Sequence, residues 1–278
     1  MRFFYAETTL SNMNFDQFWT QIQQNVPLFE HFQLQIIWEY RALFIDGAKM
    51  TIGITLIAVV LGTLIGLVMG MARLAEVKHG PWKYVVRCLA RWPANAYVTF
   101  FRGTPLFVQI LLIHFAVMPL LVHPVDGMLI SGDLAAELRQ EHGAFMSGLV
   151  ALTLNSGAYI TEIFRAGIQS IAKGQFEASR SLGMNYWQTM RFIIVPQAFR
   201  RMLPPLGNEA IMLLKDSSLV SAIGLAELAY AARTVAGAYS RYWEPYLMIS
   251  LIYLVLTLVM AAGVSWLENR YRESGGIH

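Results

Sequence analysis

The run from Met50 to Ala72, MTIGITLIAVVLGTLIGLVMGMA, contains no charged side chain. An α-helix rises about 1.5 Å per residue, so this run can cross a hydrocarbon layer about 30 Å thick. The rest of the chain fits the same class, because 56% of its 278 residues are hydrophobic and only 14% are charged. An average soluble protein carries about 25% charged residues. The sequence therefore predicts an all-α membrane protein.

Four other segments are apolar enough to be membrane spans, although they are less uniform than the first. The complete prediction is five transmembrane helices, at residues 50–72, 94–121, 145–165, 206–232 and 246–267. In the first of them, Gly62 and Gly66 stand four positions apart, which predicts a small-residue face for close contact with another helix.

The spans divide the chain into three parts. Residues 1–48 are predicted to be an N-terminal extracytoplasmic segment, residues 49–268 the transmembrane domain, and residues 269–278 a cytoplasmic tail. Apolar residues recur at helical spacing in Asn14–Val26, which therefore lies on the membrane surface as an amphipathic helix or belongs to a loosely structured tail. The single cysteine, Cys88, excludes an intramolecular disulfide.

The second span is interrupted by the motif FFRGTP. Gly103 can end a helix, Thr104 is a common N-cap residue, and Pro105 suits the first position of a new helix. We therefore expect a break near Arg102–Thr104, with these four residues at a gate or a subunit interface. Arg102 either pairs with a carboxylate there or anchors the helix end at the membrane surface.

Lysine and arginine are unevenly distributed among the segments between the spans, and such residues favour the cytoplasmic side. They concentrate in residues 73–91, in residues 165–215 and in the C-terminal tail. The segment 123–143 is acidic instead, with four carboxylates and one arginine. The bias places the N-terminus and the segment 123–143 outside, and the C-terminus in the cytoplasm.

The cytoplasmic segment between spans 3 and 4 is patterned rather than merely basic. Lys173–Gly174 is typical of a helix stop, and the residues from Gln175 to Leu182 have the length of two helical turns. Gly183 suits the position just after a helix end, where a left-handed backbone is needed. The sequence predicts a short helix held at the tip of two longer ones.

The same residues carry a resemblance to a known family. Glu177-Ala178-Ser179, three residues, Gly183, nine residues and then IIVP resembles the EAA loop of ABC-importer permeases, whose pattern is Glu-Ala-Ala, three residues, Gly, nine residues, Ile-x-Leu-Pro. Three further stretches, FFRGTPLFVQ, ALTLNSGAYITEIFRAGI and LLKDSSLVSAIGLAEL, are similar to the branch that takes up polar amino acids such as His, Glu, Gln and Arg, or opines. The resemblance covers about residues 49–267.

The resemblance implies a set of partners. Such permeases pair as homo- or heterodimers, receive substrate from an extracytoplasmic binding protein, and lie in the bacterial cytoplasmic (inner) membrane with two ATP-binding subunits attached. The EAA loop would be the coupling helix on the ATPase, through Glu177, Ala178, Ser179, Leu182 and Gly183. The chain has no Gly-x4-Gly-Lys-Ser/Thr motif, so we expect it to be no enzyme and to hydrolyse no ATP itself. We expect it to bind no cofactor, with ATP and Mg on the partner ATPase. We expect neither a metal site nor a nucleic-acid partner.

Polar residues inside the third span are candidates for a substrate path, because polar groups in a membrane are costly. Asn155, Tyr159 and Glu162 share one helix face, and Ser156 would give local room. Alternatively these residues bind neighbouring helices, with Glu162 paired to Arg165.

A second group of path candidates lies in the fourth span, at Lys215, Asp216 and Ser217. They mark either a helix break near a gate or a capped helix start, with Asp216 or Ser217 as the N-cap. Glu227, farther along, faces either the amino group of a substrate or solvent.

Other functions fit the sequence less well. A permease for an opine or a sulfur compound would share the same motifs. A secondary transporter would need a coupling-ion site, often built from inverted repeats, and no clear repeat is visible. An intramembrane enzyme would need a catalytic constellation, yet the six histidines are scattered.

Overall fold

The computed structural model describes residue 17, residues 32–74, residue 80 and residues 82–273. The predicted amphipathic segment Asn14–Val26 lies outside these residues except for Gln17, and so do the last five residues of the tail. The helices of the described part, in chain order, are α3 (Leu34–Glu39), α4 (Arg41–Leu74), α5 (Trp82–Val86), η2 (Arg87–Arg91), α6 (Trp92–Gly103), α7 (Leu106–Leu112), η3 (Ile113–Val117), α8 (Met118–Leu121), α9 (Asp133–Gln169), α10 (Lys173–Ser181), α11 (Tyr186–Thr189), η4 (Met190–Ile194), α12 (Val195–Asp216), η5 (Ser217–Ile223), α13 (Leu228–Tyr239) and α14 (Trp243–Glu273).

Three of these helices, α4, α9 and α14, are long and apolar enough to cross a membrane. A fourth span is complete if the helices at Tyr84–Gly103 and Leu106–Leu121, which are bent by 109° at a short break, count as one. The described residues thus form a helical bundle, with a single isolated bridge between Val122 and Ile130 and no sheet. The all-α class is confirmed, and the helices contain the first, third and fifth predicted spans.

The fourth predicted span, residues 206–232, is not one continuous helix. Helix α12 already begins at Val195 and ends at Asp216, and the chain then passes through the 3-10 turn η5 to α13. The hydroxyl of Ser217 donates to the Leu214 carbonyl (2.7 Å). Gly224 has a φ of +89°, a backbone conformation that residues with a side chain rarely adopt. Local hydrogen bonding at the helix end has therefore overridden the apolar pattern.

Two predicted helix ends are also corrected. Thr104 is not an N-cap: its hydroxyl donates to the Phe100 carbonyl (2.8 Å), so it satisfies the end of α6, and Pro105 precedes the first residue of α7. Lys173–Gly174 is not a stop, because α9 ends at Gln169 and Lys173 is the first residue of α10.

Helices α4 and α9 pack closely along a row of glycines. A Cβ added at Gly62 would lie 3.1 Å from Ser156 Oγ, and one added at Gly66 would lie 2.5 Å from Ile160 Cγ2. The predicted small-residue face of the first span is thus confirmed, and α9 is the helix that it contacts. Buried apolar residues from α4, α7, α9, α12 and η5 form the largest core beside this contact.

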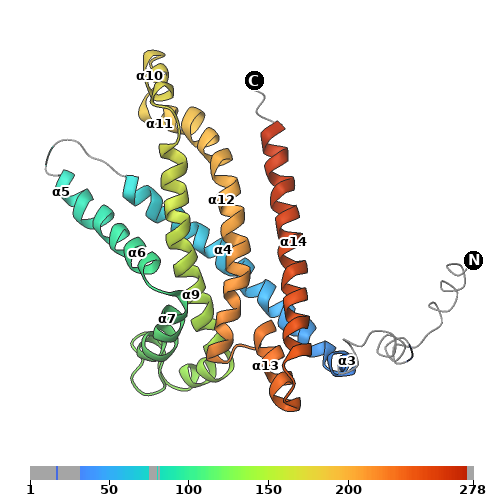
Figure 1. Cartoon of the computed structure of the whole chain (residues 1–278). Coiled ribbons are helices and arrows are strands. Elements are labelled where there is room, and N and C mark those ends of the chain that lie inside the picture. The colour runs from blue at the N-terminus through green and yellow to red at the C-terminus, as the bar shows by residue number, and fades with distance from the viewer. Residues whose placement is uncertain (1–16, 18–31, 75–79, 81, 274–278) are drawn as a thin grey trace, which may run out of the picture.

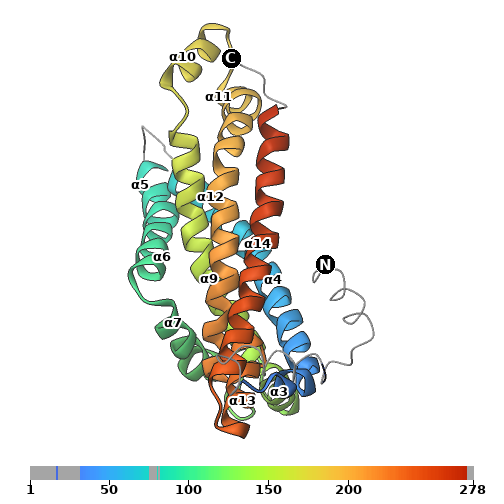
Figure 2. The same ribbon diagram turned by 45° about the vertical axis from the view of Figure 1, so that its right-hand side comes forward.

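The bundle has two distinct ends. In Figures 1 and 2, α9, α12 and α14 run side by side, and α10 and α11 lie at one end, near the last described turns of α14. The short helices α3 and α13 lie at the opposite end. Helix α9 ends and α12 begins at the α10 end, which places the patterned segment 173–196 at the tip of the bundle.

Candidate functional site

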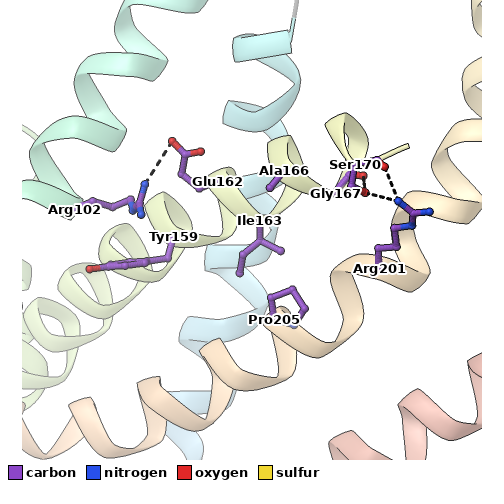
Figure 3. A pocket seen from close by; sticks show the side chains of 9 residues that line it. All are labelled: Arg102, Tyr159, Glu162, Ile163, Ala166, Gly167, Ser170, Arg201 and Pro205. Carbon is purple, nitrogen blue, oxygen red and sulfur yellow. Dashed lines mark hydrogen bonds and ion pairs between the residues drawn. The ribbon is translucent and has the colours of Figure 1, made fainter. Parts of the chain in front are cut away.

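A cavity of about 440 Å³ opens between α6, α9 and α12, toward the α10 end of the bundle. Figure 3 shows Tyr159 and Glu162 of α9, Arg102 of α6 and Arg201 of α12 around it. The remaining lining residues are small or apolar: Ile163, Ala166, Gly167, Ser170 and Pro205. The cavity thus combines a smooth apolar wall with a few charged groups, as small-molecule sites do.

Glu162 is the centre of a charge cluster beside this cavity. Its carboxylate binds the guanidinium groups of Arg73 on α4 and of Arg165 on its own helix (2.7 Å), and Arg102 of α6 lies 3.5 Å away. The predicted Glu162–Arg165 pair is therefore present as part of a larger cluster that joins three helices. Three cations around one carboxylate leave the cluster with a net positive charge.

Arg102 reaches the cavity from the end of α6. Its guanidinium carbon lies 5.2 Å from the centre of the Tyr159 ring, within the range of a cation–π contact. Its side chain is 42% exposed, which is more than twice the value for Glu162 or Arg73. Arg165 is similarly exposed (36%), but of the three arginines around Glu162 only Arg102 is among the described residues that line the cavity.

Arg201 lies on the other wall of the cavity. It donates from Nη1 to the Ser170 carbonyl at 2.5 Å, just past the end of α9. Since the last carbonyl groups of a helix carry partial negative charge, this contact stabilises the helix end. Arg201 thus fixes the position of α9 relative to α12, and the sequence analysis did not single it out.

Asn155 lies elsewhere, although it shares a helix face with Glu162. It is buried (6% exposed), and its Nδ2 donates to the Gln109 side-chain oxygen (2.9 Å) and to the Phe101 carbonyl (3.2 Å). Gln109 in turn donates from Nε2 to the carbonyls of Phe101 (2.8 Å) and Thr104 (3.0 Å). The two amides therefore satisfy backbone groups that the break between α6 and α7 leaves open.

The remaining path and gate candidates are spread over the bundle. Ser156 is buried against Gly62 of α4, Lys215 is exposed at the end of α12, and Ser217 is buried in η5. None of these three, and neither Asn155 nor Asp216, is among the described residues that line the 440 Å³ cavity. Of the four gate residues at the FFRGTP motif, Arg102 lines the cavity, whereas Gly103, Thr104 and Pro105 form the break itself.

Glu227 is fully buried, so of the two alternatives for it, exposure to solvent is excluded. Its carboxylate accepts hydrogen bonds from the backbone N–H of Tyr230 (2.9 Å) and from the hydroxyl of Tyr253 (2.9 Å). It caps the start of α13 and ties it to α14. In the part of the chain that the structure describes, no group of His, Cys, Asp or Glu residues is arranged to hold a metal.

Helix α10 ends as the sequence predicts. Gly183 has a φ of +79°, its N–H donates to the Arg180 carbonyl (2.9 Å), and the N–H of Met184 donates to the Ser179 carbonyl (3.1 Å). This pair of bonds is a Schellman motif, which requires a left-handed residue where Gly183 stands. The helix is closed in a fixed geometry at the tip of the bundle.

The residues of α10 divide into an outer and an inner set. Glu177, Ala178 and Gly183 are exposed, and Leu182 is 82% exposed. Ser179 is buried and shares a hydrogen bond with the Thr189 hydroxyl (2.9 Å). The outer set lies on the surface of the bundle tip, whereas Ser179 holds α10 to α11.

The comparisons with known proteins identify the family. Residues 82–273 match the family described as "Binding-protein-dependent transport system inner membrane component". The chain belongs to this family.

Curated relatives extend the match beyond that region. The chain is 36% identical over 241 residues to the glutamine transport system permease protein GlnP of Escherichia coli, covering 87% of this chain and 98% of the relative. It is 33% identical over 216 residues to the arginine transport system permease protein ArtQ of Bacillus subtilis, covering 78% of this chain and 86% of the relative.

Solved structures agree. The structure described as "Crystal structure of an amino acid ABC transporter with histidines" superposes with a TM-score of 0.70 at 37% sequence identity, covering 86% of this chain and 98% of that chain. The MetNI methionine ABC transporter in an inward-facing conformation superposes with a TM-score of 0.64 at 17% identity, covering 86% of this chain and 99% of that chain, and this likeness shows the shared fold alone.

Proposed function

We propose that this chain is the permease subunit of an ATP-driven importer for polar amino acids. The observation that carries the proposal is its similarity, over nearly the whole length of the relatives, to permease proteins named for glutamine and arginine transport. The structure has a cavity between three helices and an exposed short helix at the bundle tip. An importer whose ATPase is a separate subunit needs both a path for the substrate and a surface on which the ATPase can dock. An opine or sulfur-compound permease is the alternative within the same family.

In the proposed orientation, the α10 end faces the cytoplasm and the α3 and α13 end faces outward. The distribution of lysine and arginine supports this placement. With α12 counted as a span beside α4, α9, α14 and the bent pair, the chain would cross the membrane five times. The membrane would be the bacterial cytoplasmic membrane.

We assign ATPase coupling to the exposed outer set of α10, which comprises Glu177, Ala178, Leu182 and Gly183. Ser179 supports this surface from within. A rigidly closed helix transmits rigid-body motion instead of absorbing it, so docking there would move the whole α9–α10–α11 unit. ATP and Mg would be bound by two partner subunits, and a second permease copy and an extracytoplasmic binding protein would complete the importer.

We place the inner part of the substrate path in the 440 Å³ cavity. The guanidinium of Arg102 suits a carboxylate of an amino acid, and Glu162 would keep that guanidinium in place. Tyr159 provides an aromatic wall. Lys215, Asp216 and Ser217 remain candidates for a part of the path nearer the outer end, because α12 stops there. Asn155 and Ser156 would shape the path only indirectly.

The substitution Gly183→Asp tests the coupling assignment. The left-handed backbone at Gly183 is strained for aspartate, and the added side chain and charge would disturb the docking surface. We expect the purified assembly, with its ATPase subunits and binding protein in proteoliposomes, to lose ATP hydrolysis stimulated by the loaded binding protein, together with ATP-dependent amino-acid uptake.

Gly174→Asp is the matched control. Gly174 lies in the first turn of the same helix, an added Cβ there would meet no atom within 4 Å, and a carboxylate is favourable at a helix start. This variant should keep its stimulated hydrolysis. Normal stimulation in a correctly assembled Gly183→Asp variant would rule out α10 as the coupling element.

A further inference from the structure

A second cavity lies at the opposite end of the bundle from α10. It has a volume of about 290 Å³ and is formed by α3, the first turns of α4 and the first turns of α14. Apolar side chains line nearly all of it, including Phe44 and Ile45 of α4 and Met248 and Ile252 of α14. This volume is near the lower end of the range for small-ligand sites, about 300–1,000 Å³. The cavity offers no polar wall to a soluble substrate.

One cation stands at the rim of this cavity. Arg41 donates from Nη1 to the Trp38 carbonyl (2.7 Å), and its guanidinium carbon lies 4.8 Å from the centre of the Trp38 ring. These two contacts fix the side chain and still leave guanidinium N–H groups for an external acceptor. Within the described residues, Arg41 makes no ion pair with a carboxylate.

The acidic groups nearby already have partners. Asp46 pairs with Lys49 (2.8 Å), and Glu244 pairs with Arg241 (3.1 Å). The carboxylate of Glu39 accepts a hydrogen bond from the Tyr239 hydroxyl on α13 (3.4 Å), and Glu39 does not line the cavity. The positive charge of Arg41 is therefore not neutralised at the cavity rim.

The cavity lies at the depth of a membrane–water boundary. Exposed aromatic side chains gather at this end of the bundle, with Trp38 at 54%, Tyr242 at 63% and Trp243 at 77% exposure. Farther along the same helices, the exposed side chains are aliphatic, such as Ile45 (53%) and Leu251 (50%). Aromatic residues above an aliphatic zone mark the headgroup level of a bilayer.

The cavity lies between α14 and the junction of α3 with α4, which we call the α3–α4 elbow. We propose that this cavity binds one anionic phospholipid of the leaflet farther from α10. The phosphate accepts hydrogen bonds from Arg41, and part of one acyl chain fills the apolar cavity between Ile45 and Ile252. The guanidinium is suited to phosphate because its planar set of donors binds two oxygens at once. The lipid would hold the α3–α4 elbow against α14.

Retention of lipid by the purified full-length complex tests this proposal. The complex is extracted from nanodiscs of mixed phosphatidylglycerol and phosphatidylethanolamine, and bound lipids are counted by native mass spectrometry. The wild type should retain one phosphatidylglycerol per chain. Arg41→Ala should lower this retention about tenfold, because a hydrogen bond to a charged group is lost.

Matched controls separate the two halves of the site. Lys49→Ala removes an exposed cation of the same helix outside the cavity and should leave retention unchanged. Ile252→Trp fills the cavity and should lower retention, whereas Leu254→Trp, on an exposed position of α14 outside the cavity, should not. Equal retention of both lipids, no retained lipid, or equal loss in Arg41→Ala and Lys49→Ala would overturn the proposal. Displacement of the lipid by inorganic phosphate alone would also overturn it.

A photo-crosslinking benzophenone amino acid in place of Ile45 identifies the occupant directly. The proposal expects a phospholipid adduct in the assembled importer. A crosslink to a peptide from residues 1–31 of the same chain, or to a second copy of the chain, would show that protein covers the cavity and would reject the lipid site.

Discussion

Asn155 and Glu162 lie two turns apart on the same face of α9, yet they do different things. Asn155 is buried, and its amide donates hydrogen bonds to the Gln109 side chain and the Phe101 carbonyl, at the break between α6 and α7. Glu162 binds three arginines and borders a 440 Å³ cavity. The two positions are nearly equivalent in the sequence pattern, and the difference arises from the helices that face them.

This contrast shows that a polar residue in a membrane helix has two distinct uses. Where a neighbouring helix is broken, open backbone carbonyls need donors, and amides such as Asn155 and Gln109 supply them. Where neighbouring helices diverge, a charged group can border a cavity because other charges and water remain within reach. Substitutions of the first kind should affect folding, and substitutions of the second kind should also affect transport.

The largest effect is expected for Glu162→Gln. The substitution leaves three guanidinium groups facing one another without a carboxylate, and breaking a buried ion pair costs about 3–5 kcal/mol. We expect the lower part of this range, roughly 3 kcal/mol, because 19% of the side chain is exposed. The midpoint of thermal unfolding in detergent should fall, and ATP-dependent uptake in proteoliposomes should be lost.

Glu141→Gln is the appropriate comparison, since it makes the same change in the exposed outer part of α9. It should leave both quantities unchanged. If the two variants unfold at the same temperature, the arginine cluster does not hold α4, α6 and α9 together.

An intermediate effect is expected for Gln109→Leu. Leucine has a similar volume, but it leaves the Thr104 carbonyl without its side-chain donor and removes one of the two partners of the Phe101 carbonyl and of the Asn155 amide. One buried unsatisfied group costs about 1–3 kcal/mol, so we expect a loss of about 2 kcal/mol in unfolding free energy. The substrate concentration for half-maximal uptake should not change.

A double-mutant cycle with Asn155→Leu sharpens this prediction. Because the two amides bind each other, the combined loss should be smaller than the sum of the single losses. Altered half-saturation with unchanged stability in either variant would instead place these amides in the substrate path.

The smallest effect on stability is expected for Tyr159→Leu. It removes the aromatic ring under Arg102, and an exposed cation–π contact contributes about 0.5–1 kcal/mol. Uptake at limiting substrate should nevertheless fall, whereas Tyr159→Phe, which keeps the ring, should transport normally. Unchanged uptake in Tyr159→Leu would show that this wall of the cavity is structural.

Local features were predictable from the sequence. The helix end at Gly183, the break after Gly103 and the contact face at Gly62 and Gly66 each depend on residues within one or two helical turns. Gly183 takes a left-handed backbone that suits glycine, and Thr104 is extended because the residue before a proline disfavours the helical conformation. Gly62 and Gly66 have no Cβ, so another helix can approach them closely. The long apolar helices were predictable for the same reason, because length and composition alone suffice.

Partners distant in the chain were not predictable. Arg73 and Glu162 are separated by 89 positions, and nothing in their local patterns connects them. The role of Asn155 depends on Gln109, whose place within the apolar run LFVQILL is the one sequence signal of buried hydrogen bonding there. The burial of Glu227 was likewise not predictable, because one of its partners, Tyr253, lies 26 positions away on α14.

The contact between α4 and α9 has a mechanical consequence. Since Ile160 occupies the space that a side chain at Gly66 would need, neither helix can slide by one residue without a collision. We therefore expect the two helices to move together as one rigid body, and α9 alone is 37 residues, or about 55 Å, long. A displacement of α9 at Gln169 should therefore carry along Asp133 at its other end and the part of α4 that packs against it.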